Sequence, residues 1–175
     1  MKDLDSRLRS VRLVCTDVDG VLTDGTLVYG EGAHTKDFNV RDGAAIKWLQ
    51  QAGIPVVFLS GLDSPATRRR AADLGIDDCI MGRLEKLPAL EAVCLKHGVG
   101  MDQVAHLGDD LYDLPLLHRV GLACCPADAV AEVQAACHLI LSVPGGQGAF
   151  REAAERILKA QDHWVTLLAR FQDGQ

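Results

Sequence analysis

The chain has 175 residues, a length that predicts one domain, residues 1–175, with a sizeable hydrophobic core. Its 48% hydrophobic and 24% charged residues are typical of a globular protein. The formal net charge of −6 argues against a nucleic acid or an anionic membrane as partner, and no apolar run reaches the roughly 18 residues that a membrane span needs.

The cysteine pattern predicts free thiols. No two of the six cysteines form a CxxC pair, and several lie in apolar runs, as expected of buried thiols in a reducing compartment. The first ten residues lack the apolar core of a signal peptide. We therefore expect a cytoplasmic protein without disulfides, its cysteines being Cys15, Cys79, Cys94, Cys124, Cys125 and Cys137.

Short apolar runs alternate with helical patterns along the chain. Residues 1–10 are expected to be a helical or irregular lead-in. The expected strands are 11–16, 55–59, 78–81, 104–107, 121–124 and 138–141. The expected helices are 44–51, 64–74, 84–97, 111–119 and 127–135, followed by one long or two shorter helices over 149–171. Ser64 is the expected cap of the second helix, with Pro65 at its first position. This alternation predicts right-handed crossovers and an α/β fold with a doubly wound, mainly parallel sheet.

A small β-hairpin is predicted over residues 26–38. Two short runs of alternating character, near Thr26–Tyr29 and Thr35–Phe38, flank the turn signal Gly30-Glu31-Gly32. We expect this hairpin to stand as a flap over the end of the first strand.

The first strand ends in a pair of carboxylates. Residues 11–25 read VRLVCTDVDGVLTDG, in which Asp17 and Asp19 follow the apolar run and precede Gly20. Residues two apart in extended chain point the same way, so both carboxylates can face one small volume. Like charges held so close are tolerable around a cation, and hard oxygen ligands suit Mg²⁺.

Polar residues also end two other expected strands. Ser60 follows 55–59, and Asp109 with Asp110 follows 104–107. In doubly wound folds ligands bind at the carboxyl ends of the strands. These side chains are therefore expected to converge with Asp17 and Asp19.

The stretch DVDGVLTDG resembles the first motif of the haloacid dehalogenase superfamily of phosphatases. Ser60, Lys86 and the Gly108-Asp109-Asp110 run with Asp113 match its later motifs in chain order. The resemblance implies a three-layer, Rossmann-like fold. It also implies that Asp17 is the nucleophile, forming an aspartyl-phosphate, and that Asp19 is the general acid and then the base.

The resemblance further implies a Mg²⁺ site and a phosphate site. Asp17, the main-chain carbonyl of Asp19 and Asp109 are the implied metal ligands. Ser60, the backbone N–H of Gly61 and Lys86 are the implied partners of the phosphoryl oxygens. Asp110 and Asp113 are expected to orient metal-bound waters or Lys86.

The chain has no room for a cap domain after the first motif or between the later ones. With FNVRDG after the flap and GGQGAFRE from Gly145, it resembles the capless phosphatases of 3-deoxy-D-manno-octulosonate 8-phosphate, which make a lipopolysaccharide precursor. That resemblance implies a sugar-phosphate substrate and a homotetramer in which neighbours close each other's sites. It also implies a sugar site lined by Asn39, Val40, Arg41, Asp42, Gly43, Lys47 and Arg70.

One residue departs from this pattern. The octulosonate enzymes commonly have Gly-Arg after their second motif, whereas here Leu62 follows Ser60-Gly61. Leucine removes a guanidinium that could hold a sugar carboxylate through two hydrogen bonds. Arg41, Lys47 and Arg70 are candidates to replace it. The six histidines have no metal-ligand spacing and are expected to be structural or at the surface.

Three other readings compete with this one. A nine-carbon, sialic-acid-type sugar 9-phosphate is the alternative substrate. A receiver-type signalling domain would share the phosphorylatable Asp on a doubly wound sheet, but it lacks the second carboxylate, Asp19. A catalytically silent assembly domain is disfavoured by the intact set of Asp17, Asp19, Lys86 and Asp109.

Overall fold

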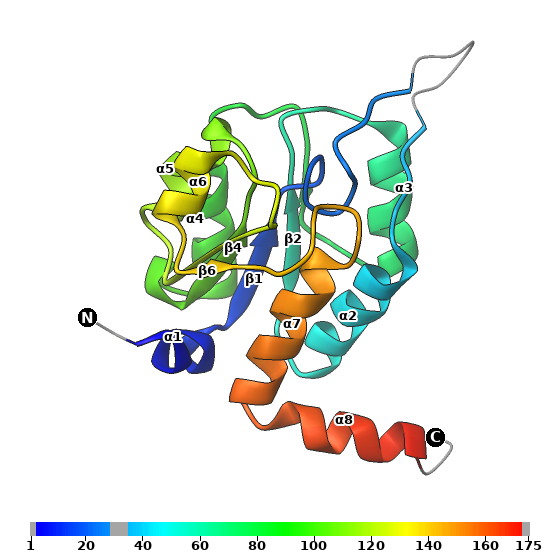
Figure 1. Cartoon of the computed structure of the whole chain (residues 1–175), viewed down its shortest axis with the longest axis vertical. Coiled ribbons are helices and arrows are strands. Elements are labelled where there is room, and N and C mark those ends of the chain that lie inside the picture. Colours follow the sequence, from blue (N-terminus) through cyan, green and yellow to red (C-terminus); the bar gives the residue numbers. More distant parts are fainter. Residues whose placement is uncertain (1–2, 29–34, 173–175) are drawn as a thin grey trace.

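The computed structural model describes residues 3–28 and 35–172. Their six strands form one parallel sheet in the order β3-β2-β1-β4-β5-β6, with helices on both faces (Figure 1). This confirms the predicted three-layer, doubly wound fold. The strands are β1 (Leu13–Thr16), β2 (Val56–Leu59), β3 (Cys79–Ile80), β4 (Val104–Leu107), β5 (Leu122–Cys125) and β6 (Leu139–Ile140).

The helices form two layers. One face of the sheet is covered by the layer of α1 (Leu4–Ser10), α2 (Val40–Gln51), α3 (Pro65–Leu74) and α7 (Ala149–Ala160), and α8 (His163–Gln172) packs against α7. The other face packs against α4 (Lys86–His97), α5 (Leu114–Leu117) and α6 (Ala131–Ala136). Two 3₁₀ turns, η1 (Met101–Gln103) and η2 (Leu111–Asp113), precede β4 and α5.

Side chains along each central strand alternate between these two layers. In β1, Val14 belongs to the core under α2 and α7, whereas Leu13 and Cys15 belong to the core under α4 and α5. In β4, Ala105 and Leu107 face the α2 and α7 side. The alternation follows from the two-residue period of extended chain, and burial on both faces explains why the runs are apolar throughout.

Four sequence expectations are corrected by the structure. Helix α2 begins at Val40 rather than 44, because the Asn39 side chain caps it by accepting the Arg41 N–H at 2.9 Å. Ser64 precedes α3 as expected, but its buried hydroxyl makes no capping hydrogen bond. The region 111–119 is a 3₁₀ turn followed by the short α5, and α6 begins at Ala131 rather than 127.

The C-terminal segment is two helices, the second of the two forms expected. Helix α7 ends before Asp162, whose φ of 62° cannot continue a right-handed helix. All six cysteines are free, as predicted, although Cys79 and Cys137 are only half-buried. Within the described ranges, no helix combines the length and the apolar character needed to cross a membrane.

The flap is described only in part. Val28 and Thr35 form one antiparallel bridge, as the predicted hairpin requires. The expected turn at Gly30-Glu31-Gly32 lies outside the described residues.

Candidate active site

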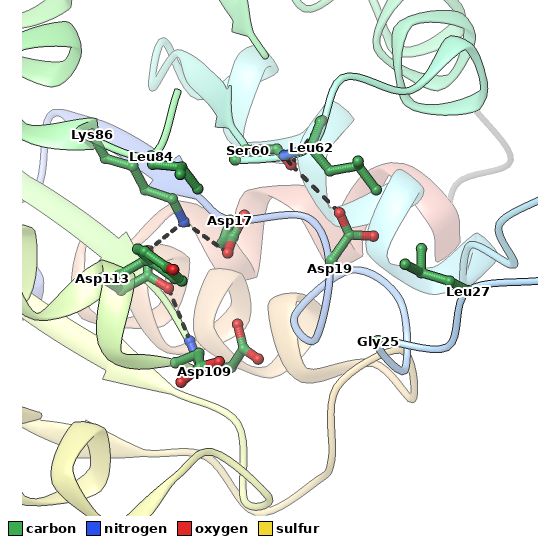
Figure 2. Close-up of a pocket in the computed structure, with 13 residues that line it drawn as sticks. Asp17, Asp19, Gly25, Leu27, Ser60, Leu62, Leu84, Lys86, Asp109 and Asp113 are labelled. Atoms are coloured by element: carbon green, nitrogen blue, oxygen red, sulfur yellow. Dashed lines mark hydrogen bonds and ion pairs between the residues drawn. The ribbon is translucent and has the colours of Figure 1, made fainter. Parts of the chain in front are cut away.

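A cavity of about 460 Å³ opens at the carboxyl ends of β1, β2 and β4. After β1 the chain adds strands first on one side of the sheet, β2 and β3, and then on the other, β4 to β6. Doubly wound sheets bind ligands at this switch point. Figure 2 shows the lining side chains pointing toward one another from separate loops. They are Asp17, Asp19, Gly25, Leu27, Ser60, Gly61, Leu62, Leu84, Lys86, Asp109, Asp110, Tyr112 and Asp113.

Asp17 is held at the floor of this cavity. Its Oδ1 accepts the Val18 N–H at 2.7 Å, and its Oδ2 lies 2.8 Å from the Nζ of Lys86. Burial, with a smaller contribution from the nearby Asp113, raises the pKa of Asp17 to about 6, although Lys86 opposes the shift. The carboxylate is thus fixed in orientation and has lost most of its contact with water.

Lys86 joins two acidic groups. The first residue of α4, it is buried and its Nζ lies 2.8 Å from both Asp17 Oδ2 and Asp113 Oδ1. Burial alone lowers the pKa of Lys86, but the carboxylates of Asp113 and Asp17 raise it above its ordinary value. The ammonium therefore stays charged at the floor of the cavity.

Asp109 provides the test of a metal site. Carboxylate oxygens of Asp17, Asp109 and Asp113 lie within 4.8 Å of one another, and the buried Oδ1 of Asp109 has no hydrogen-bond partner. Burial and the charges of Asp17 and Asp113 raise the pKa of Asp109 to about 8. An unpartnered oxygen beside two further carboxylates fits a hard divalent cation such as Mg²⁺.

The backbone of the Asp17–Gly20 loop passes directly against Asp109. Gly20 has a φ of 87°, and a Cβ at this position would lie 2.0 Å from Asp109 Oδ2. Only glycine permits both the turn and the approach. The loop that follows Asp19 is therefore held against the Asp109 carboxylate.

Asp19 lies between Ser60 and a lysine of the flap. Its Oδ2 is 3.4 Å from the Ser60 hydroxyl, which itself accepts the Leu62 N–H at 3.2 Å. The Nζ of Lys36 lies 2.5 Å from Asp19 Oδ1 and 2.7 Å from Oδ2. Sequence reasoning missed Lys36. It lies in the second run of the predicted hairpin, Thr35–Phe38, which was expected to stand over the two carboxylates, and this position could have identified it.

The expected sugar-site residues do not reach this cavity in the described part of the chain. Asn39, Asp42, Gly43 and Arg70 instead surround a small closed space between α2 and α3, and Lys47 Nζ donates to the Leu74 carbonyl at 2.6 Å. Val40 and Arg41 are exposed at the start of α2. A role for these seven residues in binding the sugar stays a prediction.

Asp42 has a structural task in this arrangement. Its Oδ1 accepts the Arg151 N–H at 2.7 Å, so a carboxylate of α2 stabilises the first turn of α7. Burial raises the pKa of Asp42 to about 6, and the Arg151 N–H opposes that rise. The Asp42 carboxylate therefore lies at a helix junction rather than in the cavity.

The rim of the cavity is apolar and exposed. Leu27 and Leu62 are about two-fifths exposed, at 38% and 39%, and Leu84 and Tyr112 are each 58% exposed. These four side chains, here called the apolar rim, come from three loops and the 3₁₀ turn η2. Large apolar side chains gathered around a polar site are typical of a binding or contact surface.

Comparison with known proteins gives a consistent result. The family model described as haloacid dehalogenase-like hydrolase matches residues 78–148. The chain is 47% identical over 159 residues to 3-deoxy-D-manno-octulosonate 8-phosphate phosphatase of Haemophilus influenzae, covering 90% of this chain and 88% of that protein.

Solved structures agree with this similarity. A probable yrbi family phosphatase of Pseudomonas syringae superposes with a TM-score of 0.96 at 40% identity, over 100% of both chains. The Moraxella catarrhalis 3-deoxy-D-manno-octulosonate 8-phosphate phosphatase, solved with a magnesium ion, a phosphate ion and KDO, gives a TM-score of 0.93 at 36% identity, covering 95% of this chain and 97% of that one.

Proposed function

The chain belongs to the 3-deoxy-D-manno-octulosonate 8-phosphate phosphatases of the haloacid dehalogenase-like hydrolases, and from this premise we propose that it hydrolyses that sugar phosphate through an aspartyl-phosphate on Asp17. The product is the free sugar acid, a precursor of lipopolysaccharide. The observation that carries the proposal is the convergence of Asp17, Asp19 and Lys86 in one cavity.

Two carboxylates divide the chemistry. Asp17 attacks phosphorus while the sugar alkoxide leaves and takes a proton from Asp19. Asp19, now ionised, then takes a proton from the water that attacks the aspartyl-phosphate, which releases inorganic phosphate and restores Asp17. Lys86 and the Ser60-Gly61 turn hold the charged phosphoryl oxygens through both steps.

The metal requirement fits the same residues. Asp17, Asp109 and the main-chain carbonyl of Asp19 are the proposed ligands, and the unpartnered Asp109 Oδ1 supports the assignment. Bound there, Mg²⁺ neutralises phosphate charge so that an anionic carboxylate can approach an anionic phosphate. Asp113 contacts Lys86 rather than standing free, so we assign it to orienting that lysine. Asp110 faces the same cavity and is proposed to orient metal-bound water.

A nine-carbon sugar acid 9-phosphate is the second candidate substrate. Leu62 favours it, because this exposed leucine stands at the cavity where the octulosonate enzymes commonly carry an arginine. A phosphate-release assay against both sugar phosphates, with and without Mg²⁺, decides between them. Activity on neither substrate, with hydrolysis of other phosphate esters intact, would overturn the substrate assignment while leaving the phosphatase chemistry.

We also propose that the enzyme works as a homotetramer in the cytoplasm. The apolar rim supports assembly, because a neighbouring subunit packed against Leu27, Leu62, Leu84 and Tyr112 would bury them and close the cavity to water. Six free thiols support a reducing compartment. Light scattering at assay concentration tests the assembly, and an active monomer would exclude it.

A further inference from the structure

His106 is a fully buried histidine directly beneath the active site. It lies in β4 between Ala105 and Leu107, which face the α2 and α7 layer, so its ring faces the opposite layer, where α4 carries Lys86. None of the roles derived above uses this imidazole. A buried ring in a strand is most often a packing group, so a further role needs geometry of its own.

That geometry is a hydrogen bond to the acid that holds Lys86. The Nε2 of His106 lies 2.9 Å from Asp113 Oδ1, and the same oxygen is 2.8 Å from the Lys86 Nζ. The other oxygen, Asp113 Oδ2, accepts the Asp109 backbone N–H at 3.3 Å. One buried carboxylate therefore connects His106 to the phosphate-binding lysine and to the backbone of a proposed metal ligand.

The two ring nitrogens of His106 differ in their surroundings. The Nδ1 of His106 is buried without a hydrogen-bond partner. The Asp113 carboxylate can only accept, so the hydrogen bond between the two side chains requires a proton on Nε2. His106 therefore donates to Asp113.

The hydrogen bond that His106 donates affects the position of the Lys86 ammonium between Asp17 and Asp113. Asp17 and Asp113 lie at equal distances of 2.8 Å from the Lys86 Nζ and compete for it. A carboxylate with fewer donors draws an ammonium more strongly, because a buried anion left unsatisfied is costly. Without His106, Lys86 would shift toward Asp113 and away from the phosphoryl oxygens.

We propose that His106 is a positioning residue for phosphoryl transfer: by donating to Asp113 it keeps Lys86 directed at the phosphate and keeps the Asp109 backbone in place. The inference rests on the proposed phosphatase function. It concerns turnover at the phosphorus and not recognition of the sugar. The effect is therefore the same for a sugar phosphate and for a small aryl phosphate.

Two variants of similar shape separate donation from packing. His106→Gln can present an N–H near the position of Nε2, whereas His106→Met fills similar space without a donor. We expect His106→Met to lower kcat by about tenfold to a hundredfold, the range for a lost hydrogen bond to a charged group, with KM within about twofold. His106→Gln should keep kcat within about threefold of wild type on both substrates.

His138→Met is the matched control, since the His138 Nδ1 accepts the Ala123 backbone N–H at 2.9 Å and the side chain lies outside the cavity. It should leave kcat unchanged. A folded His106→Met that keeps wild-type kcat, or a His106→Gln that loses as much as His106→Met, would overturn the proposal. A wild-type enzyme with no phosphatase activity would instead refute the underlying function.

A measurement on the unaltered protein covers the case in which neither variant folds. In ¹⁵N-labelled histidine spectra at neutral pH, the His106 signals should show a proton on Nε2. A ring protonated on Nδ1 alone would lack the donor to Asp113 and would overturn the proposal without any variant.

Discussion

Lys36 holds the proposed general acid: its ammonium lies 2.5 Å from Asp19 Oδ1 and 2.7 Å from Asp19 Oδ2, and its side chain is 0% exposed. The lysine follows the Val28–Thr35 bridge, so the pair links the flap to the catalytic loop. Flap position and the orientation of the Asp19 carboxylate are therefore coupled in this structure.

Lys36→Met should lower kcat by about tenfold or more, because Asp19 loses a charge-assisted partner that fixes its rotamer. Lys96→Met is the matched control: Lys96 also pairs with a carboxylate, Asp78 at 2.6 Å, but its side chain is 57% exposed and does not line the cavity. Exposed pairs contribute only about 0–1 kcal/mol, so this variant should behave as wild type. Equal kinetics in the two variants would argue against the coupling.

Asp17→Asn should abolish turnover while keeping the fold, because an amide is a poor nucleophile and a poor Mg²⁺ ligand. Asp19→Asn should lower kcat by roughly 10² to 10⁴-fold through loss of leaving-group protonation. Asp63→Asn, which alters an exposed ion pair with Arg68, is the control and should not change kcat. Near-normal turnover in either site variant would falsify the assignment.

Metal binding should stabilise the protein more as pH rises. The pKa values of Asp17 and Asp109 in the metal-free chain, about 6 and about 8, lie above the ordinary value of 3.8. The folded chain therefore holds protons that the unfolded chain has released, and between about pH 4 and pH 8 its free energy of unfolding falls as pH rises. A cation replaces those protons, so the gain in Tm on adding Mg²⁺ should grow from about pH 5.5 to about pH 8.5.

Thermal melts with Mg²⁺ and with EDTA at several pH values measure this gain. Subtracting the EDTA Tm at each pH removes the pH dependence that comes from titratable groups remote from the metal. Asp109→Asn should remove both the gain and its pH dependence. A Tm gain that stays constant with pH in the wild type would contradict the raised pKa values as the source of the linkage.

Leu62→Arg should strengthen binding of the octulosonate phosphate. Leu62 lines the cavity beside Ser60, and a charge-assisted hydrogen bond to the sugar carboxylate contributes about 1.5–3 kcal/mol, which corresponds to at least about tenfold in KM. Hydrolysis of a small aryl phosphate should stay unchanged, because Asp17 and Lys86 are untouched. An unaltered KM in the folded variant indicates that another group already holds the carboxylate or that a different sugar is the substrate.

The positions of the chemical groups could be predicted from the sequence because they follow strand ends. Asp17, Ser60 and Asp109 each come within two residues of the end of a run whose apolar character marks a strand buried on both faces. Parallel strands end at one edge of the sheet, which fixes their convergence. Lys86 was harder to place, since a lysine at a helix start is usually solvated, and only its order among the other motifs singled it out.

The remaining contacts join side chains that the hydrophobic periodicity of the sequence does not bring together. Lys36 and His106 act through side chains whose partners lie 17 and 7 residues away in the chain. Their residue types fit an ordinary strand or core position equally well. Asp42 accepts the Arg151 N–H in the first turn of α7, across 109 residues of chain. Local patterns could not reveal that partner, because the α2–α7 junction forms only in the folded domain.

The glycine loop before α7 has a consequence for the order in which the enzyme becomes active during synthesis. The Gly146 N–H donates to the Val21 carbonyl at 3.0 Å, and a Cβ on Gly145 would lie 1.9 Å from the Gly20 carbonyl oxygen. The loop that carries the proposed nucleophile is thus supported by backbone translated some 125 residues later. A nascent chain stalled before residue 145 should carry every catalytic side chain yet release no phosphate, and activity should appear only as the glycine loop emerges from the ribosome. Because α7 follows immediately and packs on α2, maturation of the site and closure of the domain become one event.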